Sequence, residues 1–262
     1  MLRAMYSAAS GMEATQTNID NISHNLANTN TTGFKQRRTQ FEDLLYQNLV
    51  SPGGNATTAT EVPTGLQIGL GTRAVSNGIV FLQGDYIQTG NDFDVAIEGA
   101  GFFRVRLADG NTAYSRAGNF HLSRDGIMVT ANGDPLEPQI TIPTEATNVL
   151  IGADGTVSYN LPGDPNAQQA GQIQLANFAN PAGLNSIGRN LYLPTAASGD
   201  AVDGIPGENG MGSLLHKFLE SSNVNIVEEM VNLIVSQRAY ESNSRVLRAA
   251  DQMYQELNNL SR

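Results

Sequence analysis

The two ends of the chain share a hydrophobic pattern that its middle lacks. Near the N-terminus, apolar and small positions follow one another in alternating steps of three and four, at Leu2, Met5, Ala9, Met12, Gln16, Ile19, Ser23 and Leu26. The same pattern recurs near the C-terminus, at Ile226, Met230, Leu233, Gln237, Tyr240, Ser244 and Leu247. This is the a/d spacing of a heptad repeat, in which a narrow apolar stripe packs against another helix. We therefore predict a helix at each end of the chain, over about residues 2–26 and from about residue 225 onward.

Local signals mark where these helices end and begin. Residues 28–33 (NTNTTG) are short polar residues followed by glycine, which compete with the helical backbone and end the first helix. Asn225 with Glu228 three residues later resembles a capping box in which Asn replaces Ser or Thr. Glu229 adds negative charge to the first turn, where the helix dipole favours it. The stripe is widened at the start of this second helix by Val227, Val231 and Ile234.

Strand signals fill the middle of the chain from Leu66 onward. Apolar residues alternate with polar or small ones, as at Val95 and Ile97 and again at Ile173 and Leu175. Turn dipeptides recur between them, at Asp109-Gly110, Asp125-Gly126, Asn132-Gly133 and Asp154-Gly155. We expect several short antiparallel strands in a small sandwich or partly open barrel. The predicted fold class is α+β, with long terminal helices in a coiled-coil-like layer and a central antiparallel all-β domain.

A third kind of segment separates the first helix from the strands. Residues 51–65 are rich in Pro, Gly, Ala and Thr, which predicts an exposed loop or polar hairpin. Before it, a second and shorter apolar piece is indicated by Phe41, Leu44, Leu45 and Leu49. We therefore divide the chain into a terminal helical domain (residues 1–45 and 221–262), an extended excursion (46–65) and a central β-rich outer domain (66–220).

Composition and charge exclude several classes of protein. The chain has 262 residues, enough for one large or two modest domains, and no Cys, which excludes disulfides and thiolate metal sites. No apolar run reaches the roughly 18 residues of a membrane span, and Ser7 and Ser10 interrupt the start of the chain before a signal-peptide core forms. The net charge of −10 argues against nucleic acid as a partner, because phosphate binding needs a basic face. We interpret the local cations Lys35, Arg37 and Arg38 as a solvated helix end.

No group of residues has the spacing of an active site. His24, His121 and His216 lie far apart, outside any metal-binding motif, and the chain has no phosphate-binding loop. Asp92 and Asp94 are conceivable paired acids for glycoside hydrolysis, but a turn that leads into a strand explains them better. We therefore assign no catalytic, metal-binding or cofactor-binding residue and no cofactor, and keep a secreted glycan-acting enzyme only as an alternative.

Three groups of motifs without catalytic chemistry occur in order along nearly the whole chain. The first comprises residues 23–28 (SHNLAN) and 32–35 (TGFK), the second residues 94–99 (DVAIEG), 101–103 (GFF) and 114–118 (YSRAG), and the third residues 222–225 (SNVN) and 237–241 (QRAYE). Together they resemble the bacterial flagellar rod and hook protein family. The length, with residues 41–47 (FEDLLYQ) and 65–69 (GLQIG), is most similar to the distal rod members. Ser115 stands where the family often has Thr, a conservative change.

The resemblance implies a structural subunit rather than an enzyme. Such proteins polymerise into a tubular helical shaft that transmits torque from the flagellar motor to the hook, with terminal helices as the inner wall. The implied partners are further copies in an open helical homopolymer, proximal rod and hook proteins along the axis, P- and L-ring proteins in a Gram-negative envelope, and the flagellar type III export apparatus. The implied location is the periplasmic rod of the basal body, reached without a cleaved signal peptide. A hook or proximal rod subunit is the alternative within the family.

The heptad stripes supply the expected polymer contacts. Two narrow stripes bury each other only in part within one chain, and one heterologous contact repeated without ring closure gives an open helical assembly. Polar seam positions, at Gln16, Ser23, Gln237 and Ser244, would fix the register. We expect the polymer interface at Leu2, Met5, Met12, Ile19, Leu26, Ile226, Met230, Leu233, Tyr240, Leu247 and Tyr254. We expect the excursion to bridge adjacent subunits through Tyr46, Pro52, Pro63 and Leu66.

Overall fold

The chain folds as two compact units. The computed structural model describes residues 2–50, 55–57, 60–61, 64–163 and 166–260. The terminal unit comprises Met1–Ala27, Arg37–Gly78 and Asn225–Arg262, and the central unit comprises Asn28–Gln36 and Ile79–Val224. Helices and antiparallel strands are both present, so the fold class is α+β as predicted.

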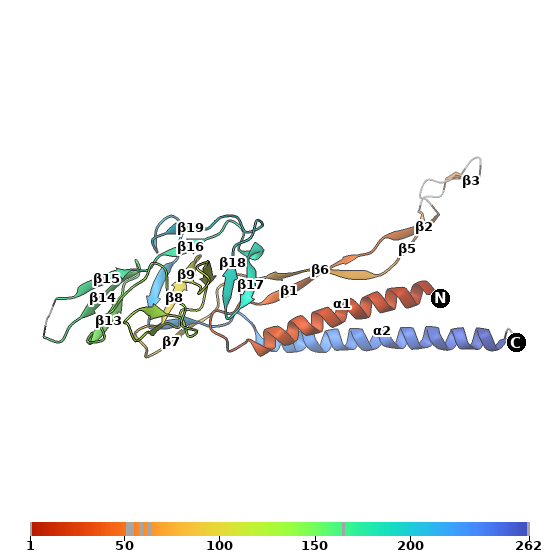
Figure 1. Ribbon diagram of the computed structural model, residues 1–262. Coiled ribbons are helices and arrows are strands. Elements are labelled where there is room, and N and C mark those ends of the chain that lie inside the picture. The colour runs from red at the N-terminus through yellow and green to blue at the C-terminus, as the bar shows by residue number, and fades with distance from the viewer. Residues whose placement is uncertain (1, 51–54, 58–59, 62–63, 164–165, 261–262) are drawn as a thin grey trace. The chain divides into compact units, whose positions relative to one another are not determined.

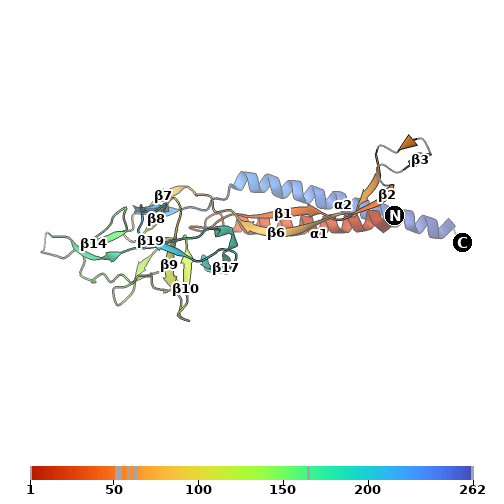
Figure 2. The same cartoon turned by 90° about the horizontal axis from the view of Figure 1, so that it is seen from above.

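Two long helices dominate the terminal unit. They are α1 (Leu2–Ala27) and α2 (Ile226–Leu260), and α1 lies beside α2 (Figures 1 and 2). The predicted boundaries are confirmed. Asn225 caps α2, because its side-chain Oδ1 accepts hydrogen bonds from the backbone N–H groups of Val227 at 3.0 Å and Glu228 at 3.3 Å.

A nested β-hairpin completes the terminal unit (Figure 1). In it β1 (Arg37–Asp43) pairs with β6 (Thr72–Ile79), β2 (Tyr46–Val50) with β5 (Leu66–Gly69), and β3 (Asn55–Thr57) with β4 (Thr60–Glu61). Strands thus begin at residue 37 and not at residue 66, and residues 37–43 are not helical. Most side chains of β1 and β2 are exposed, so the sequence lacks the alternation that marks a half-buried strand.

Asparagine side chains attach β1 to α1. Asn25 Nδ2 donates to the Arg37 carbonyl at 2.8 Å, and Asn25 Oδ1 accepts from the Arg37 N–H at 2.9 Å. Asn21 Nδ2 donates to the same carbonyl and to Thr39 Oγ1, both at 3.0 Å. Because both asparagines are buried, these bonds fix the base of the hairpin on the helix.

A second attachment lies farther along the hairpin. The Thr72 amide donates to Ser10 Oγ of α1 at 3.3 Å. Next to it, Gly71 has a φ of +123°, and a Cβ at this position would overlap Ser10 Oγ. Only glycine therefore lets the strand approach the helix here.

The central unit consists of short strands. They are β7 (Tyr86–Gln88), β8 (Val95–Glu98), β9 (Phe102–Arg106), β10 (Thr112–Ser115), β11 (His121–Leu122), β12 (Met128–Val129), β13 (Asn148–Ile151), β14 (Thr156–Asn160), β15 (Gln168–Gln172), β16 (Leu175–Asn177), β17 (Asn185–Gly188), β18 (Leu191–Leu193), β19 (Val202–Gly204), β20 (Ser213–His216) and β21 (Phe218–Glu220). Pro181–Gly183 form a short 3-10 helix. A six-stranded sheet has the order β17-β18-β10-β9-β16-β19, and a three-stranded sheet the order β13-β14-β15. Within the described residues the larger sheet ends at β17 and β19, so it is open and not a closed barrel.

Strand β9 carries hydrophobic core on both of its faces. Neighbouring residues of a strand point to opposite sides, so Phe102 and Phe103 enter two different clusters. The Phe103 ring packs edge-on against Phe120 with centroids 5.0 Å apart, and the Phe102 ring against Phe178 at 5.7 Å. Both phenylalanines of the strand are buried, which makes β9 the central strand of the unit.

The predicted turns between strands are confirmed. In each of the dipeptides at 109–110, 125–126, 132–133 and 154–155, the glycine N–H donates to the carbonyl three residues earlier, at 2.9–3.0 Å. Gly126 illustrates why glycine is needed, since its φ is +75° and a Cβ would overlap the Ile142 carbonyl oxygen. The tight turns place consecutive strands next to each other.

A buried charge triad joins three distant segments of the central unit. Glu220 Oε1 lies 2.5 Å from Lys35 Nζ, and Glu220 Oε2 lies 2.6 Å from Arg116 Nε. The side chains of Lys35, Arg116 and Glu220 are only 2%, 6% and 0% exposed. The interpretation of Lys35 as part of a solvated helix end is therefore wrong. Its partner, Glu220, lies 185 positions later in the sequence, so no local sequence pattern could reveal the ion pair.

The triad shifts the ionisation of its members. Burial lowers the pKa of Lys35, and the Glu220 carboxylate offsets this only in part. Burial alone would raise the pKa of Glu220, but Arg116, Lys35 and the Gly84 amide together hold that pKa below its ordinary value. Glu220 is therefore ionised at neutral pH and pairs with both buried cations.

Removal of the Glu220 charge should destabilise the central unit. The change Glu220→Gln leaves two buried cations without a counter-charge, and we expect it to lower the free energy of unfolding by about 3–5 kcal/mol. The matched control is Asp92→Asn, because Asp92 pairs with Lys217 where both side chains are substantially exposed; it should change stability by less than about 1 kcal/mol. Urea unfolding measures both, and equal losses would contradict a special role for the triad.

Acid should act through the same carboxylate. Because the pKa of Glu220 is lower in the folded chain, its contribution is fully present above the unfolded value of about 4.5 and is lost as pH falls through the lower folded value. Between about pH 6 and pH 3, wild type should therefore lose more stability than Glu220→Gln. Urea midpoints across this range test the difference, and parallel pH profiles for the two proteins would argue against it.

Candidate functional site

The candidate acids and histidines do not assemble into a reaction centre. Asp92 pairs with Lys217 at 2.7 Å, while Asp94 accepts a hydrogen bond from Asn91 Nδ2 at 2.9 Å. His216 Nε2 contacts the backbone carbonyl of Asp92 at 2.9 Å. Within the described part of the chain, no three His, Asp or Glu side chains come together as a set of metal ligands. These residues hold the turn that leads into β8.

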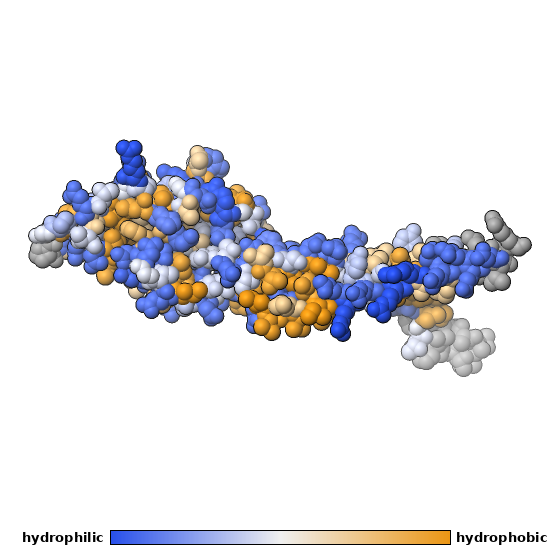
Figure 3. Space-filling view, turned by 90° about the horizontal axis from the view of Figure 1, so that it is seen from below, coloured by the Kyte–Doolittle hydropathy of each residue, from blue (hydrophilic) through white to orange (hydrophobic). Residues whose placement is uncertain are grey.

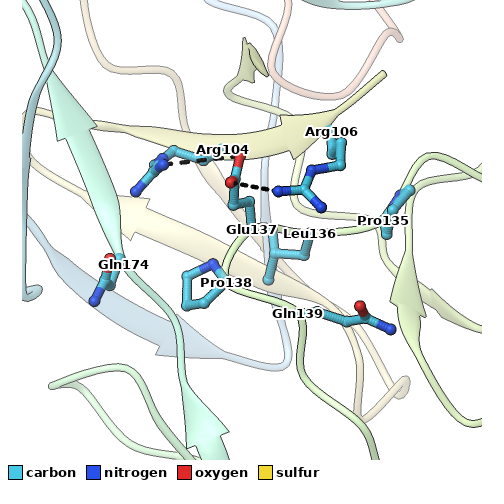
Figure 4. Close-up of a pocket in the computed structure, with 8 residues that line it drawn as sticks. All are labelled: Arg104, Arg106, Pro135, Leu136, Glu137, Pro138, Gln139 and Gln174. Carbon is cyan, nitrogen blue, oxygen red and sulfur yellow. Dashed lines mark hydrogen bonds and ion pairs between the residues drawn. The ribbon is translucent and has the colours of Figure 1, made fainter. Parts of the chain in front are cut away.

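A surface cavity of about 340 Å³ lies in the central unit (Figure 4). Figure 4 shows Glu137 between Arg104 and Arg106, with distances of 3.7 Å and 3.1 Å to their guanidinium groups. Arg104 also pairs with Asp203 at 3.0 Å. The one carboxylate that lines this cavity is thus paired with two arginines, which leaves no pair of acids for hydrolysis.

Several small and polar side chains lie between α1 and α2. Asn18 Nδ2 donates to Ser236 Oγ at 2.9 Å, and Asn25 Nδ2 to Glu229 Oε2 at 3.4 Å. Gly11 faces Asn243 so closely that a Cβ would lie 2.8 Å from its amide nitrogen. The helices also bury Ala8, Ala14 and Ala250 and, among their large apolar side chains, Ile22. Many other large apolar side chains of the pair remain exposed.

Most large apolar residues in the first turns of α2 point away from this contact. At about 100° per residue, the first turns of α2 present an apolar face over about half of the helix circumference. Glu229 and Ser236, which bond to α1, lie on the opposite side. The outer face is 46–71% exposed, and Figure 3 shows a hydrophobic patch over this part of the molecule. We call it the α2 patch: Ile226, Val227, Met230, Val231, Ile234 and Val235.

The predicted interface residues fall into two groups by exposure. Half-buried side chains are those of Met5, Met12, Ile19, Leu26, Leu233 and Leu247. Exposed side chains are those of Ile226, Met230, Tyr240 and Tyr254. Tyr46 and Leu66 of the hairpin are exposed as well. The side chain of Leu2, together with Pro52 and Pro63, lies outside the described residues.

Heptad reasoning missed the residues that join the two helices. It selected Gln16, Ser23, Gln237 and Ser244 as polar seam positions; the first three are exposed and Ser244 is half-buried. The polar contacts come instead from Asn18 with Ser236 and from Asn25 with Glu229, while Asn243 packs against Gly11. A signal was available, because asparagines at 18, 21 and 25 recur in steps of three and four on one face of α1.

Three family models match successive parts of the chain. They are the flagella basal body rod protein model over residues 5–35, the flagellar hook protein FlgE/F/G D1 domain over residues 96–159, and the flagellar basal body rod FlgEFG protein C-terminal model over residues 216–260. Each matched segment contributes one member of the buried triad: Lys35, Arg116 and Glu220.

Full-length relatives agree with these matches. The flagellar basal-body rod protein FlgG of Buchnera aphidicola subsp. Schizaphis graminum is 46% identical over 99% of this chain and 100% of that protein. FlgG of Caulobacter vibrioides is 48% identical over 97% of each. The chain belongs to the flagellar basal-body rod protein family. It is a structural subunit of the distal rod and not an enzyme, which removes the glycan-acting alternative.

A solved structure gives a weaker likeness. The Helicobacter pylori flagellar hook protein FlgE2 is 17% identical, with a TM-score of 0.25. The match covers 71% of this chain and 43% of that protein, so the chain spans less than half of the hook protein's length. Among the described residues of the rod subunit, neither helix combines the length and apolar character of a membrane span.

A charge on the α2 patch should prevent assembly without unfolding the subunit. Ile234→Asp places a carboxylate at a half-exposed site, so the isolated chain should keep its stability within about 0.5 kcal/mol. Burial of that carboxylate between subunits would cost several kcal/mol. We expect folded monomer by circular dichroism and no rods by electron microscopy. Leu150→Asp, on an exposed leucine of β13 in the central unit, is the control and should still assemble; normal rods from Ile234→Asp would rule out the patch as an interface.

Proposed function

We propose that the chain polymerises through its terminal helices into the tubular, torque-transmitting shaft of the flagellar rod. The observation that carries this proposal is the α2 patch, which faces away from α1 in the isolated chain. Full burial of a Val, Ile or Met side chain contributes about 1.5–3 kcal/mol, so stacked copies would gain a large free energy at each contact. A soluble monomer has no comparable reason to expose such a surface.

The terminal helices of many copies would form a coiled-coil-like inner layer, with the central units outside. The half-buried residues Met5, Met12, Ile19 and Leu26 of α1 offer a second contact surface for neighbouring helices. Contacts between unlike surfaces of identical subunits propagate without closing and give an open helical polymer. Within this scheme the helices α1 and α2 are the polymerisation core, and the central unit, Asn28–Gln36 and Ile79–Val224, is the outer domain, so the boundary expected at residue 66 falls inside the hairpin.

Location and further partners follow from the same proposal. The rod subunit would cross the inner membrane through the flagellar type III apparatus without a cleaved signal and assemble in the periplasm. Proximal rod and hook proteins would adjoin the polymer along its axis, and P- and L-ring proteins would surround it in a Gram-negative envelope. The net charge of −10 per subunit would favour weak, patchy contacts with those rings.

Electron microscopy of purified basal bodies at subunit resolution tests this arrangement. The proposal requires the α2 patch to be covered by other copies and the central unit to lie at larger radius. A rod in which Val231 and Ile234 face solvent would overturn it.

The nested hairpin is proposed to bridge adjacent subunits and stiffen the shaft. Beyond the attachment at Ser10, strands β2 and β5 and the residues next to them expose large apolar side chains to solvent, among them Leu45, Tyr46, Leu49, Val50, Leu66 and Leu70. These side chains would pack on a neighbouring copy, as predicted for residues 46–65. Contacts that join neighbours away from the axis resist bending, which suits a straight shaft.

Deletion of residues 51–62 should leave assembly intact but give curved rods. The α2 patch would still drive polymerisation, whereas the bridge between neighbours would be shortened. Filament curvature in electron micrographs measures the effect. The residues removed lie partly outside the described part of the chain, so point variants on β2 and β5 provide a second test.

The double change Leu49→Ser and Leu66→Ser removes apolar contacts of the described strands without shortening the hairpin. It should also increase curvature, because both leucines are exposed in the isolated chain and would be buried only by a neighbour. Leu82→Ser, on an exposed leucine of the central unit, is the matched control. If both hairpin variants form straight rods, the hairpin does not stiffen the shaft and acts only as a linker.

A further inference from the structure

A second cavity in the central unit lies against the buried triad. Its volume is about 190 Å³, and its lining includes Lys35, Arg116, Phe81, Phe102 and Gln83. This is well above the roughly 10–15 Å³ that holds one water molecule. The cavity shown in Figure 4 differs from it, because there Glu137 and Asp203 balance Arg104 and Arg106.

The triad beside this cavity carries an uncompensated positive charge. Two cations, Lys35 and Arg116, share the single carboxylate of Glu220. The charged groups that act on Lys35 are Glu220, which attracts it, and Arg116, which repels it. All three residues are at least nine-tenths buried, and a buried charge without a partner is costly. An anion in the cavity would remove this imbalance.

Each of the two cations also has a hydrogen-bond donor to spare. The Lys35 ammonium has three N–H bonds, of which two reach the Leu82 carbonyl at 2.7 Å and Glu220 Oε1 at 2.5 Å. Arg116 Nε donates to Glu220, and its Nη2 donates to the carbonyls of Ile97 and Gly99.

Arg116 Nη1 has two N–H bonds, and one of them reaches the Gly101 carbonyl at 2.5 Å. Among the described residues, the third N–H of Lys35 and the second N–H of Arg116 Nη1 therefore have no acceptor. Buried donors are normally paired, so two spare donors on cations that line one cavity indicate a missing acceptor.

We propose that this cavity binds one carboxylate or other small monoanion between Lys35 Nζ and Arg116 Nη1. The anion would accept the two spare N–H bonds and bring the buried cluster to zero net charge. Aromatic rings of Phe81 and Phe102 line the same cavity, which suits a carboxylate with a short hydrocarbon stem. Such a group has two sources: a free anion from solution, or an Asp or Glu side chain of a second copy. Binding of a side chain from a second copy rests on the proposed polymer, whereas binding of a free anion does not.

The free anion is tested on the full-length monomer by NMR. Sodium acetate is titrated at constant ionic strength, and the backbone amide signals of Gly99 and Gly101 are followed. We expect saturable shifts confined to residues around the cavity. Lys35→Gln makes the cluster neutral and should weaken acetate binding by about tenfold or more, since a charged hydrogen bond contributes about 1.5–3 kcal/mol. Lys217→Gln, on a substantially exposed lysine of the same unit, should bind like wild type.

The second source is tested in assembled wild-type rods, which needs no variant to fold. A cryo-electron map should show density for a carboxylate of a neighbouring subunit inside the cavity. Acetate binding to the monomer supports the free anion, and a neighbour's carboxylate in the rod supports the second copy. Neither signal, with water alone in the cavity, would overturn the site. Well-formed rods with a water-filled cavity, from a monomer that does not bind acetate, would overturn the site and leave the proposed polymerisation intact.

Discussion

The carboxylate of Glu220 is the point on which the central unit depends. It binds Lys35, which follows α1, and Arg116, which follows β10, and it lies at the end of the last strand before α2. The backbone around it repeats the connection, since the Gly33 amide donates to the Glu220 carbonyl at 2.8 Å. The two segments that link the central unit to the terminal helices are therefore fixed to each other by one buried group.

The terminal unit, in contrast, leaves large apolar side chains exposed. Asn, Ser, Gly and Ala side chains lie between its two helices, while Val, Ile and Met in the first turns of α2 face outward. Small and polar side chains between two helices specify the register of the pair but contribute little hydrophobic free energy. One chain thus combines a central unit that buries its own hydrophobic core with a terminal unit that leaves apolar side chains exposed. This difference between the two units fits a subunit that folds first and then assembles with other copies.

Local signals in the sequence revealed much of this architecture. The heptad steps and the Asn225 cap predicted both helices, and Asp-Gly and Asn-Gly dipeptides predicted the turns, because each depends on residues close in the chain. Burial of Lys35 was missed because its partner is distant in sequence. The strand at Arg37–Asp43 was missed because the Asn21 and Asn25 side chains that hold it belong to another element. Periodicity identified apolar stripes at the candidate interface, but it could not tell which face one helix would turn to the other.

The span between bonded partners also determines when the subunit can take its final form. Lys35 meets a group 185 positions later, and Asn18 meets Ser236 across 218 positions. Neither connection can close until almost the whole chain is available, and contacts of such long separation form slowly. Synthesis proceeds from the N-terminus, so α1 has no α2 to pair with until the last segment of the chain has been made. The last segment, α2, thus completes the fold. A chain that lacks this segment cannot pair α1 with α2.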